Sequence, residues 1–248
     1  MSLPTLFISH GSPMLLIEDS PAHRFLAGLG RDLPRPSAIL VASAHWATPS
    51  PAVSAAALPE TIHDFRGFPR ELYDARYPAP GAPELAAKAA ALLEAGLDEG
   101  RGLDHGAWIP LALAWPEADI PVLQVSLQPH LGPAHHLELG HRLKPLRDEG
   151  VLILASGALT HNLRDYFTGG DGGGWVEDFS TWIGDAVEQG RVEDLLDYRR
   201  RAPWAERNHP TEEHLLPLFL ALGAASGPGR IIHRSRDKSL AMDSFRFD

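Results

Sequence analysis

Four short, continuous runs of apolar residues most limit what this chain can fold into. Since none of them alternates polar with apolar side chains, each is predicted as a strand covered on both faces, as in a parallel sheet. Strands of this kind need helices on either side of the sheet. The four predicted strands are Leu3–Ser9, Ala38–Ala44, Ile120–Leu127 and Val151–Ser156.

Helical patterns lie between and after these runs. Pro83–Ala95 is rich in strong helix formers, and Ala134–Glu149 repeats leucine at spacings of four and three. The alternation predicts an α/β fold: a single three-layer domain over residues 1–248, whose mostly parallel or mixed central sheet has helices on both faces. The other predicted helices are Pro21–Leu29, Glu177–Gln189 and Pro210–Leu222, and the β-like segments Arg230–Arg234 and Ser239–Phe247 are expected to pair at a sheet edge.

Glycine and proline mark two local features. The glycine-rich stretch Gly169–Gly174 is predicted as a flexible loop. Pro217 removes one hydrogen bond from the last predicted helix and is expected to kink it.

The chain has no cysteine and thirteen histidines. The first fact excludes disulfides, thiolate nucleophiles, zinc fingers and iron–sulfur clusters. A net charge of −10 argues against a nucleic-acid partner, which requires a basic surface. Histidine is then the remaining strong nitrogen ligand for a metal and the acid/base group suited to neutral pH.

No apolar run approaches the roughly 18 residues that a membrane span needs. The N-terminal apolar stretch has no basic region before it, so a secretory signal is not expected. These features predict a cytoplasmic protein with no membrane partner.

Three histidines come shortly after predicted strands. His10 follows the first strand, His45 the second and His161 the fourth. In α/β sheets, ligands bind beyond the carboxyl ends of the strands. Taken singly, each histidine reads as an ordinary hydrogen-bonded residue, but their convergence at one edge predicts a metal site.

His214 belongs to a different context, the segment Asn208–His214. Pro210 suits the first turn of the predicted helix, and a histidine there can point back over the sheet edge. The alternative is a histidine on the helix surface.

The remaining histidines differ in how strongly their surroundings indicate a function. His63–Pro69 places imidazole, carboxylate and guanidinium groups in one turn-like segment, and Asp104–Trp108 leads into a helix. His135, His136 and His141 lie on a predicted amphipathic helix and are interpreted as a solvated face. No role is assigned to His23, His130 and His233.

Several strings of residues together resemble the class III extradiol ring-cleavage dioxygenases, and are most similar to the DOPA-4,5-dioxygenase branch. They cover nearly the whole chain in the right order. The strings are FISHGSPM (7–14), ASAHW (42–46), HDFRGFP (63–69), YPAPGAPELA (77–86), DHGAW (104–108), ASGALTHNL (155–163) and HPTEEHLLPL (209–218).

The resemblance implies a metal held by His10, His45 and His214, with His161 as the catalytic acid/base and His105 as a second histidine of the pocket. Many relatives use two histidines and one carboxylate. Here the third position is histidine, with Glu213 beside it as a carboxylate alternative. Whether His161 also binds the metal when no substrate is present is left open.

The function expected from this resemblance is a non-haem, metal-dependent extradiol dioxygenase that opens the ring of a catechol such as DOPA with O2. One divalent metal per chain is expected, Zn²⁺ as isolated and Fe²⁺ for activity. His63 and Arg66 are expected to hold the polar tail of the substrate, and a homo-oligomer is left open. The alternatives are a zinc hydrolase that uses a metal-bound water, and a non-enzymatic metal-binding scaffold, which leaves the convergence of histidines unexplained.

Overall fold

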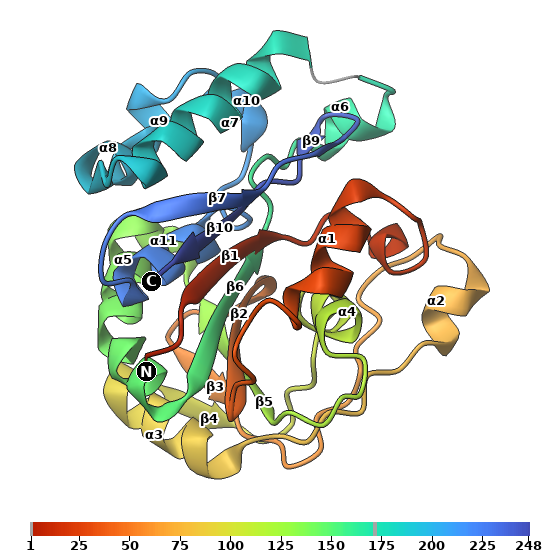
Figure 1. Ribbon diagram of the computed structural model, residues 1–248, viewed down its shortest axis with the longest axis vertical. Coiled ribbons are helices and arrows are strands. Elements are labelled where there is room, and N and C mark those ends of the chain that lie inside the picture. Colours follow the sequence, from red (N-terminus) through yellow and green to blue (C-terminus); the bar gives the residue numbers. More distant parts are fainter. Residues whose placement is uncertain (1, 171–172) are drawn as a thin grey trace.

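The computed structural model describes residues 2–170 and 173–248 of the chain. An eight-stranded mixed sheet lies in the middle, with helices packed on both of its faces (Figure 1). The strand order across the sheet is β4-β3-β5-β2-β6-β1-β10-β7. The strands are β1 (Thr5–Ser9), β2 (Ala38–Ala47), β3 (Ala52–Ser54), β4 (Gly96–Asp98), β5 (Val122–Leu127), β6 (Val151–Gly157), β7 (Gly229–His233) and β10 (Ser244–Phe247).

The four predicted apolar runs form the centre of this sheet. Strands β5, β2, β6 and β1 are neighbours and run parallel, and every residue of β1, β5 and β6 is buried. The α/β fold with a mixed sheet is therefore confirmed. Strand β10 pairs antiparallel with β1, and β7 pairs antiparallel with β10 at the edge, so the predicted pairing of the two C-terminal segments is also confirmed.

Two hydrophobic cores cover the two faces, because successive strand residues point to opposite sides. Leu40 of β2 packs in one core and its neighbour Ile39 in the other. The first core contains α3 (Pro83–Leu93), α5 (Gly132–Leu143), α7 (Gly173–Glu188) and α11 (Leu216–Ala224), and the second contains α1 (Pro21–Leu29) and α4 (His105–Ala114).

Shorter elements complete the described chain. No described helix is both long and apolar enough to cross a membrane. Helix α6 lies next to a small hairpin, β8–β9, above the end of the sheet (Figure 1). The short elements are α2 (Arg70–Asp74), α6 (Leu163–Phe167), α8 (Val192–Leu196), α9 (Tyr198–Arg201), α10 (Ala205–Asn208), the 3₁₀ helices Pro13–Leu16, Pro129–Leu131 and Lys144–Glu149, and the strands β8 (Arg236–Asp237) and β9 (Leu240–Ala241).

The last helix begins later than predicted. Residues 210–215 form bends and turns, and α11 starts at Leu216. Pro217 therefore lies in the first helical turn, where its missing N–H has no intrahelical partner to lose, and it does not kink the helix. As a result His214 sits on the turn that precedes α11, not on a helix.

The glycine-rich stretch is only partly a loop. Residues 171–172 lie outside the described residues, whereas Gly173 and Gly174 belong to the first turn of α7, which starts before the predicted Glu177.

The predicted solvated face of three histidines is wrong for His136. His136 is completely buried; its Nδ1 donates to the Gly132 carbonyl at 2.7 Å and its Nε2 accepts from the Gln128 backbone N–H at 3.1 Å. It lies three residues before Leu139 and so shares that leucine's buried helix face. His135 is half-buried and His141 is exposed.

Candidate metal centre

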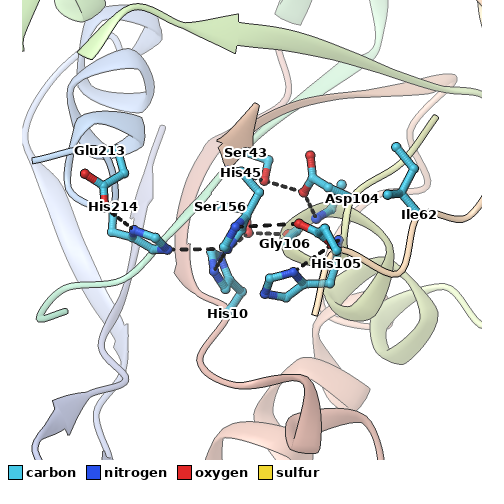
Figure 2. Close-up of polar contacts among 12 residues, drawn as sticks. His10, Ser43, His45, Ile62, Asp104, His105, Gly106, Ser156, Glu213 and His214 are labelled. Carbon is cyan, nitrogen blue, oxygen red and sulfur yellow. Dashed lines mark hydrogen bonds and ion pairs between the residues drawn. The ribbon is translucent and has the colours of Figure 1, made fainter. Parts of the chain in front are cut away.

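Five imidazoles meet beyond the carboxyl ends of the parallel strands. In Figure 2, His10, His45 and His214 point toward one another from different parts of the chain, with His105 beside them. The ring of His161 stacks on that of His214, with ring centroids 3.4 Å apart. The predicted convergence of His10, His45, His161 and His214 is present, and His105 joins it. His10, His105 and His214 are buried, and His45 and His161 are half-buried.

The ends of two strands place the first pair. His10 follows β1 directly, and its backbone N–H donates to the Gly157 carbonyl at the end of β6. His45 lies inside β2, which extends further than predicted. The register of β2 against β5 shifts between Ala42 and Ala47, and an irregularity of this kind redirects side chains at a strand end.

A buried carboxylate positions His105. Asp104 caps helix α4 by accepting from the Ala107 N–H, and it also accepts from Ser43, Arg101 and Gln124. This anchors the first turn of α4, which carries His105, against β2. Gly106 permits the close approach, because a Cβ there would lie 2.6 Å from the Ser43 hydroxyl and 2.9 Å from the His45 ring.

The turn that carries His214 is attached to the end of β6. The Ala158 N–H donates to the His214 carbonyl at 2.9 Å, and a Cβ on Gly157 would lie 2.1 Å from that same oxygen. The loop that carries His161 is joined to the same segment: the His161 N–H donates to the Asn208 carbonyl, and His209 Nε2 donates to the Leu159 carbonyl. These contacts hold the two histidines next to each other.

Three ring nitrogens face one another at the centre. His45 Nε2 lies 3.0 Å from His10 Nε2 and 3.3 Å from His214 Nε2. Ligand nitrogens bound at 2.0–2.1 Å to one tetrahedral metal lie about 3.3–3.4 Å apart. The two distances from His45 Nε2 are therefore close to those between ligands of a shared metal ion.

Hydrogen bonds at the Nδ1 atoms of these rings indicate which ring nitrogen carries the proton. The Ser156 hydroxyl donates to the Gly106 carbonyl, so it accepts from His10 Nδ1–H at 3.0 Å. His214 Nδ1–H donates to the Glu213 carboxylate at 3.0 Å, and His45 Nδ1 faces the Asp64 carboxylate at 3.7 Å. Nε2 of His10 and Nε2 of His214 then each carry a lone pair that faces His45 Nε2, an arrangement in which the three rings can share one cation. The residues present fit a divalent metal.

Burial keeps these imidazoles neutral. It lowers the pKa of His10 and of His214 well below the usual 6.5, and the neighbouring histidines lower both further. Burial also lowers the pKa of His45 and of His161 to about 4, although Asp104 opposes the shift at His45 and Glu213 opposes it at His161. Neutral imidazole is the form that binds a metal or accepts a proton.

Two carboxylates hold the outer sides of the cluster. Asp64 Oδ1 accepts from both the backbone N–H and Nδ1–H of His105, each at 2.9 Å. Burial opposes the charge of Asp64, but the hydrogen bonds from His105 outweigh it and bring its pKa down to about 2. Glu213 Oε1 contacts both His214 Nδ1 and His161 Nδ1, at 3.0 and 3.9 Å. Sequence reasoning gave Asp64 no role, because its partner lies 41 residues away.

Two separate sets of ligand atoms, which share no residue, are close enough to hold an ion within the described residues. One is His10, His45 and His105; the other is His161, Glu213 and His214. The Nε2 contacts of His45 connect the two sets. We prefer His214 to His105 as the third ligand because His214 Nε2 lies 3.3 Å from His45 Nε2, whereas the hydrogen bond of the His105 ring goes from Nδ1 to Asp64.

A cavity of about 500 Å³ opens over the histidines. All five imidazoles line it, together with Arg66, Phe65 and Phe68. His63 does not line it: its ring packs against Trp108 and Tyr73, and its Nε2 donates to the Ala75 carbonyl. Of the two residues predicted for the polar tail of a substrate, only Arg66 lies at the cavity.

Proteins of known description match nearly the whole chain. A 4,5-DOPA dioxygenase extradiol of Beta vulgaris is 44% identical over 256 residues, which cover 98% of this chain and 96% of the relative. A protein of the same description from Escherichia coli K12 is 44% identical over 238 residues, covering 91% of this chain and 86% of the relative.

A solved structure of an uncharacterised Escherichia coli K12 protein superposes with a TM-score of 0.82 at 36% identity, covering 99% of this chain and 100% of that one. Residues 4–244 match the family described as the catalytic LigB subunit of aromatic ring-opening dioxygenase. This chain therefore belongs to the LigB family, the class III extradiol dioxygenases, and is an aromatic ring-opening dioxygenase.

Proposed function

We propose that this enzyme opens the ring of a catechol with O2 at one divalent metal held by Nε2 of His10, His45 and His214, within one catalytic domain spanning residues 1–248. The observation that carries the proposal is that His45 Nε2 lies 3.0 Å from His10 Nε2 and 3.3 Å from His214 Nε2. Neutral imidazoles whose nitrogens lie this close together can bind one divalent cation through their lone pairs.

A catechol such as DOPA is the substrate that we propose. Two relatives identical at 44% carry the description 4,5-DOPA dioxygenase extradiol. The cavity is large enough for a ring with a substituent, since small-molecule sites usually have about 300–1,000 Å³.

Protein side chains handle the protons and orient the substrate. His161, neutral and half-buried, would take a proton from a catechol hydroxyl and later return it. His105 would donate from Nε2 only after gaining a proton, because Asp64 holds its Nδ1–H; otherwise Nε2 accepts from a substrate hydroxyl. Arg66 would contact the polar tail, with His63 packed behind the aromatic wall. When bound, Fe²⁺ supplies the one-electron chemistry that lets O2 react with the ring.

The metal that we propose for activity is Fe²⁺, with Zn²⁺ bound in protein isolated in air. Zinc ranks above Fe²⁺ in the general affinity order, and a site without thiolate has little means to reject it. Imidazole also fits zinc, but the family match and the descriptions of the relatives favour ring opening over the hydrolase alternative.

The test is oxygen uptake with metal content measured on the same samples. Protein purified in air is expected to contain mostly zinc and to consume little O2 with DOPA. Removal of that zinc and anaerobic loading with Fe²⁺ should restore uptake and produce a ring-opened product, while reloading with zinc should not. Full turnover by the zinc form, or hydrolysis of esters without O2, would contradict the proposal.

A further inference from the structure

The outer part of the cavity has a charged group of residues that the ring-opening chemistry does not use. Tyr166 of α6 and Asp237 and Lys238 of the β8–β9 hairpin all line the same cavity as the five histidines. The Tyr166 hydroxyl donates to Asp237 Oδ2 at 3.0 Å, and Lys238 Nζ lies 4.5 Å from the centroid of the Tyr166 ring. In Figure 1, α6 and the hairpin lie together above the sheet.

The hairpin is attached directly to the loop that carries His161. The Ala241 N–H donates to Thr160 Oγ1 at 2.8 Å, and the Thr160 hydroxyl donates to the Ser239 carbonyl at 3.3 Å. The Met242 N–H closes the base of the hairpin on the Ser235 carbonyl. These hydrogen bonds fix the hairpin that carries Lys238 relative to Thr160, the residue that precedes His161.

The backbone of Lys238 adopts a left-handed conformation, with φ of 51°. Lys238 is the first residue of the two-residue turn between β8 and β9, a position where a positive φ is usual in tight hairpins. Here the conformation places the ammonium group over Tyr166 at the cavity wall.

Some charged side chains at this wall have a polar partner and others do not. Asp237 already accepts from Tyr166, whose pKa burial and Asp237 together raise to about 12, so the phenol remains a donor. Lys238 and Arg66 form no ion pair within residues 2–170 and 173–248. Glu18, the other acid of the cavity lining, is exposed, as are Lys238 and Arg66, and it too forms no ion pair among the described residues. The cavity thus offers two unpaired cations to a ligand.

We propose that Lys238 is a specificity-determining residue that pairs with a carboxylate on the substituent of the catechol, assisted by Arg66. This inference rests on the proposed function, since it assumes that the ring binds at the histidines. It narrows the substrate class to catechols with an anionic side chain and disfavours those whose only charge is an ammonium group.

The experiment compares three catechols with Fe²⁺-loaded protein: 3-(3,4-dihydroxyphenyl)propionate, dopamine and 4-ethylcatechol. They share the reacting ring and differ in the charge of the side chain. The wild type should give the highest kcat/KM with the propionate. Lys238→Gln should lower that value by roughly fivefold, as is usual for a partly exposed ion pair, and leave 4-ethylcatechol nearly unchanged.

Charge reversal gives a second, independent result. Lys238→Glu should lower kcat/KM for the propionate by about tenfold or more and raise it for dopamine, because the sign of the local charge changes. Lys144→Gln, which removes a positive charge from the 3₁₀ helix Lys144–Glu149 away from the cavity, is the matched control and should alter none of the ratios.

The outcomes separate the two proposals. If no catechol is consumed, the proposed function fails. If 4-ethylcatechol is turned over but the preference for propionate over dopamine is absent in the wild type, or persists unchanged in both Lys238 variants, only the role of Lys238 is wrong.

Discussion

The imidazoles of His161 and His214 stack nearly parallel, with planes 12° apart and ring centroids separated by 3.4 Å. Their Nδ1 atoms both face Glu213 Oε1, at 3.9 and 3.0 Å. The proposed metal ligand and the proposed acid/base thus stack on each other and share one carboxylate. Substitution of either histidine is expected to affect the other. Loss of His214 should mainly remove the metal, whereas loss of His161 should mainly reduce turnover.

His161→Gln is expected to retain most of the metal and to lose turnover by roughly 10²–10⁴-fold, the usual contribution of a positioned acid/base. Metal content and oxygen uptake are measured on the same Fe²⁺-loaded samples. A variant that no longer binds metal would show that His161 is a primary ligand.

Replacement of a ligand should remove the metal itself. His10→Ala, His45→Ala and His214→Ala are each expected to bind almost no zinc after dialysis, because each leaves two nitrogens in place of three. His105→Ala should retain the metal and lose activity. Retention by His214→Ala together with loss by His105→Ala would instead assign the site to His10, His45 and His105.

Glu213→Gln tests whether the carboxylate beside His214 is a ligand or supports one. A glutamine oxygen can still accept from His214 Nδ1–H, so metal affinity should fall by about 10–100-fold without being abolished. Affinity is measured by titration against a competing chelator. The neighbouring Glu212→Gln, which removes an ion pair with Arg199, serves as the control. Abolished binding in Glu213→Gln alone would make Glu213 a direct ligand.

Asp64→Asn tests how His105 is positioned. Loss of the carboxylate charge weakens the hold on His105 Nδ1–H, so kcat should fall by roughly 10–100-fold while metal content is unchanged. Asp74→Asn, at an exposed carboxylate paired with Arg70, should leave kcat unaltered. If metal is lost in parallel with rate, Asp64 acts mainly through His45, whose Nδ1 it faces at 3.7 Å.

The central sheet could be predicted because buried parallel strands carry a local signal, a continuous apolar run. The histidines at the ends of these strands could be placed for the same reason. His214 was predicted on a helix because residues 210–222 combine a proline with helix formers, yet the helix starts at Leu216. The segment before Leu216 is attached to the end of β6 by the hydrogen bond from the Ala158 N–H to the His214 carbonyl, and these residues are far apart in the sequence.

The supporting carboxylates had no local signal. Asp64 and His105 are 41 residues apart, and Asp104 acts as a helix cap and as an acceptor for Ser43, 61 residues away. By contrast, the burial of His136 could have been predicted, since it shares the helix face of Leu139 and Leu143. The leucine spacing that predicts this helix also predicts that His136 lies on its buried face.

His136 provides a test of stability against pH at a distance from the metal centre. Burial lowers its pKa from the usual 6.5 to about 4. Between these values the unfolded chain binds a proton at this position and the folded chain does not. The free energy of unfolding therefore decreases as pH falls from 6.5 to 4, by up to about 3 kcal/mol from this group.

His136→Gln should flatten that decrease, because glutamine does not titrate. Urea unfolding is measured between pH 4 and 7.5 in the presence of a chelator, so that release of metal does not contribute. His141→Gln, at an exposed position on the same helix, is the matched control and should leave the slope as in the wild type. The slope is the quantity compared, since the glutamine variant also alters hydrogen bonds to Gln128 and Gly132 and shifts stability at every pH. An unchanged slope in His136→Gln would mean that this imidazole gains its proton as readily in the folded chain as in the unfolded one.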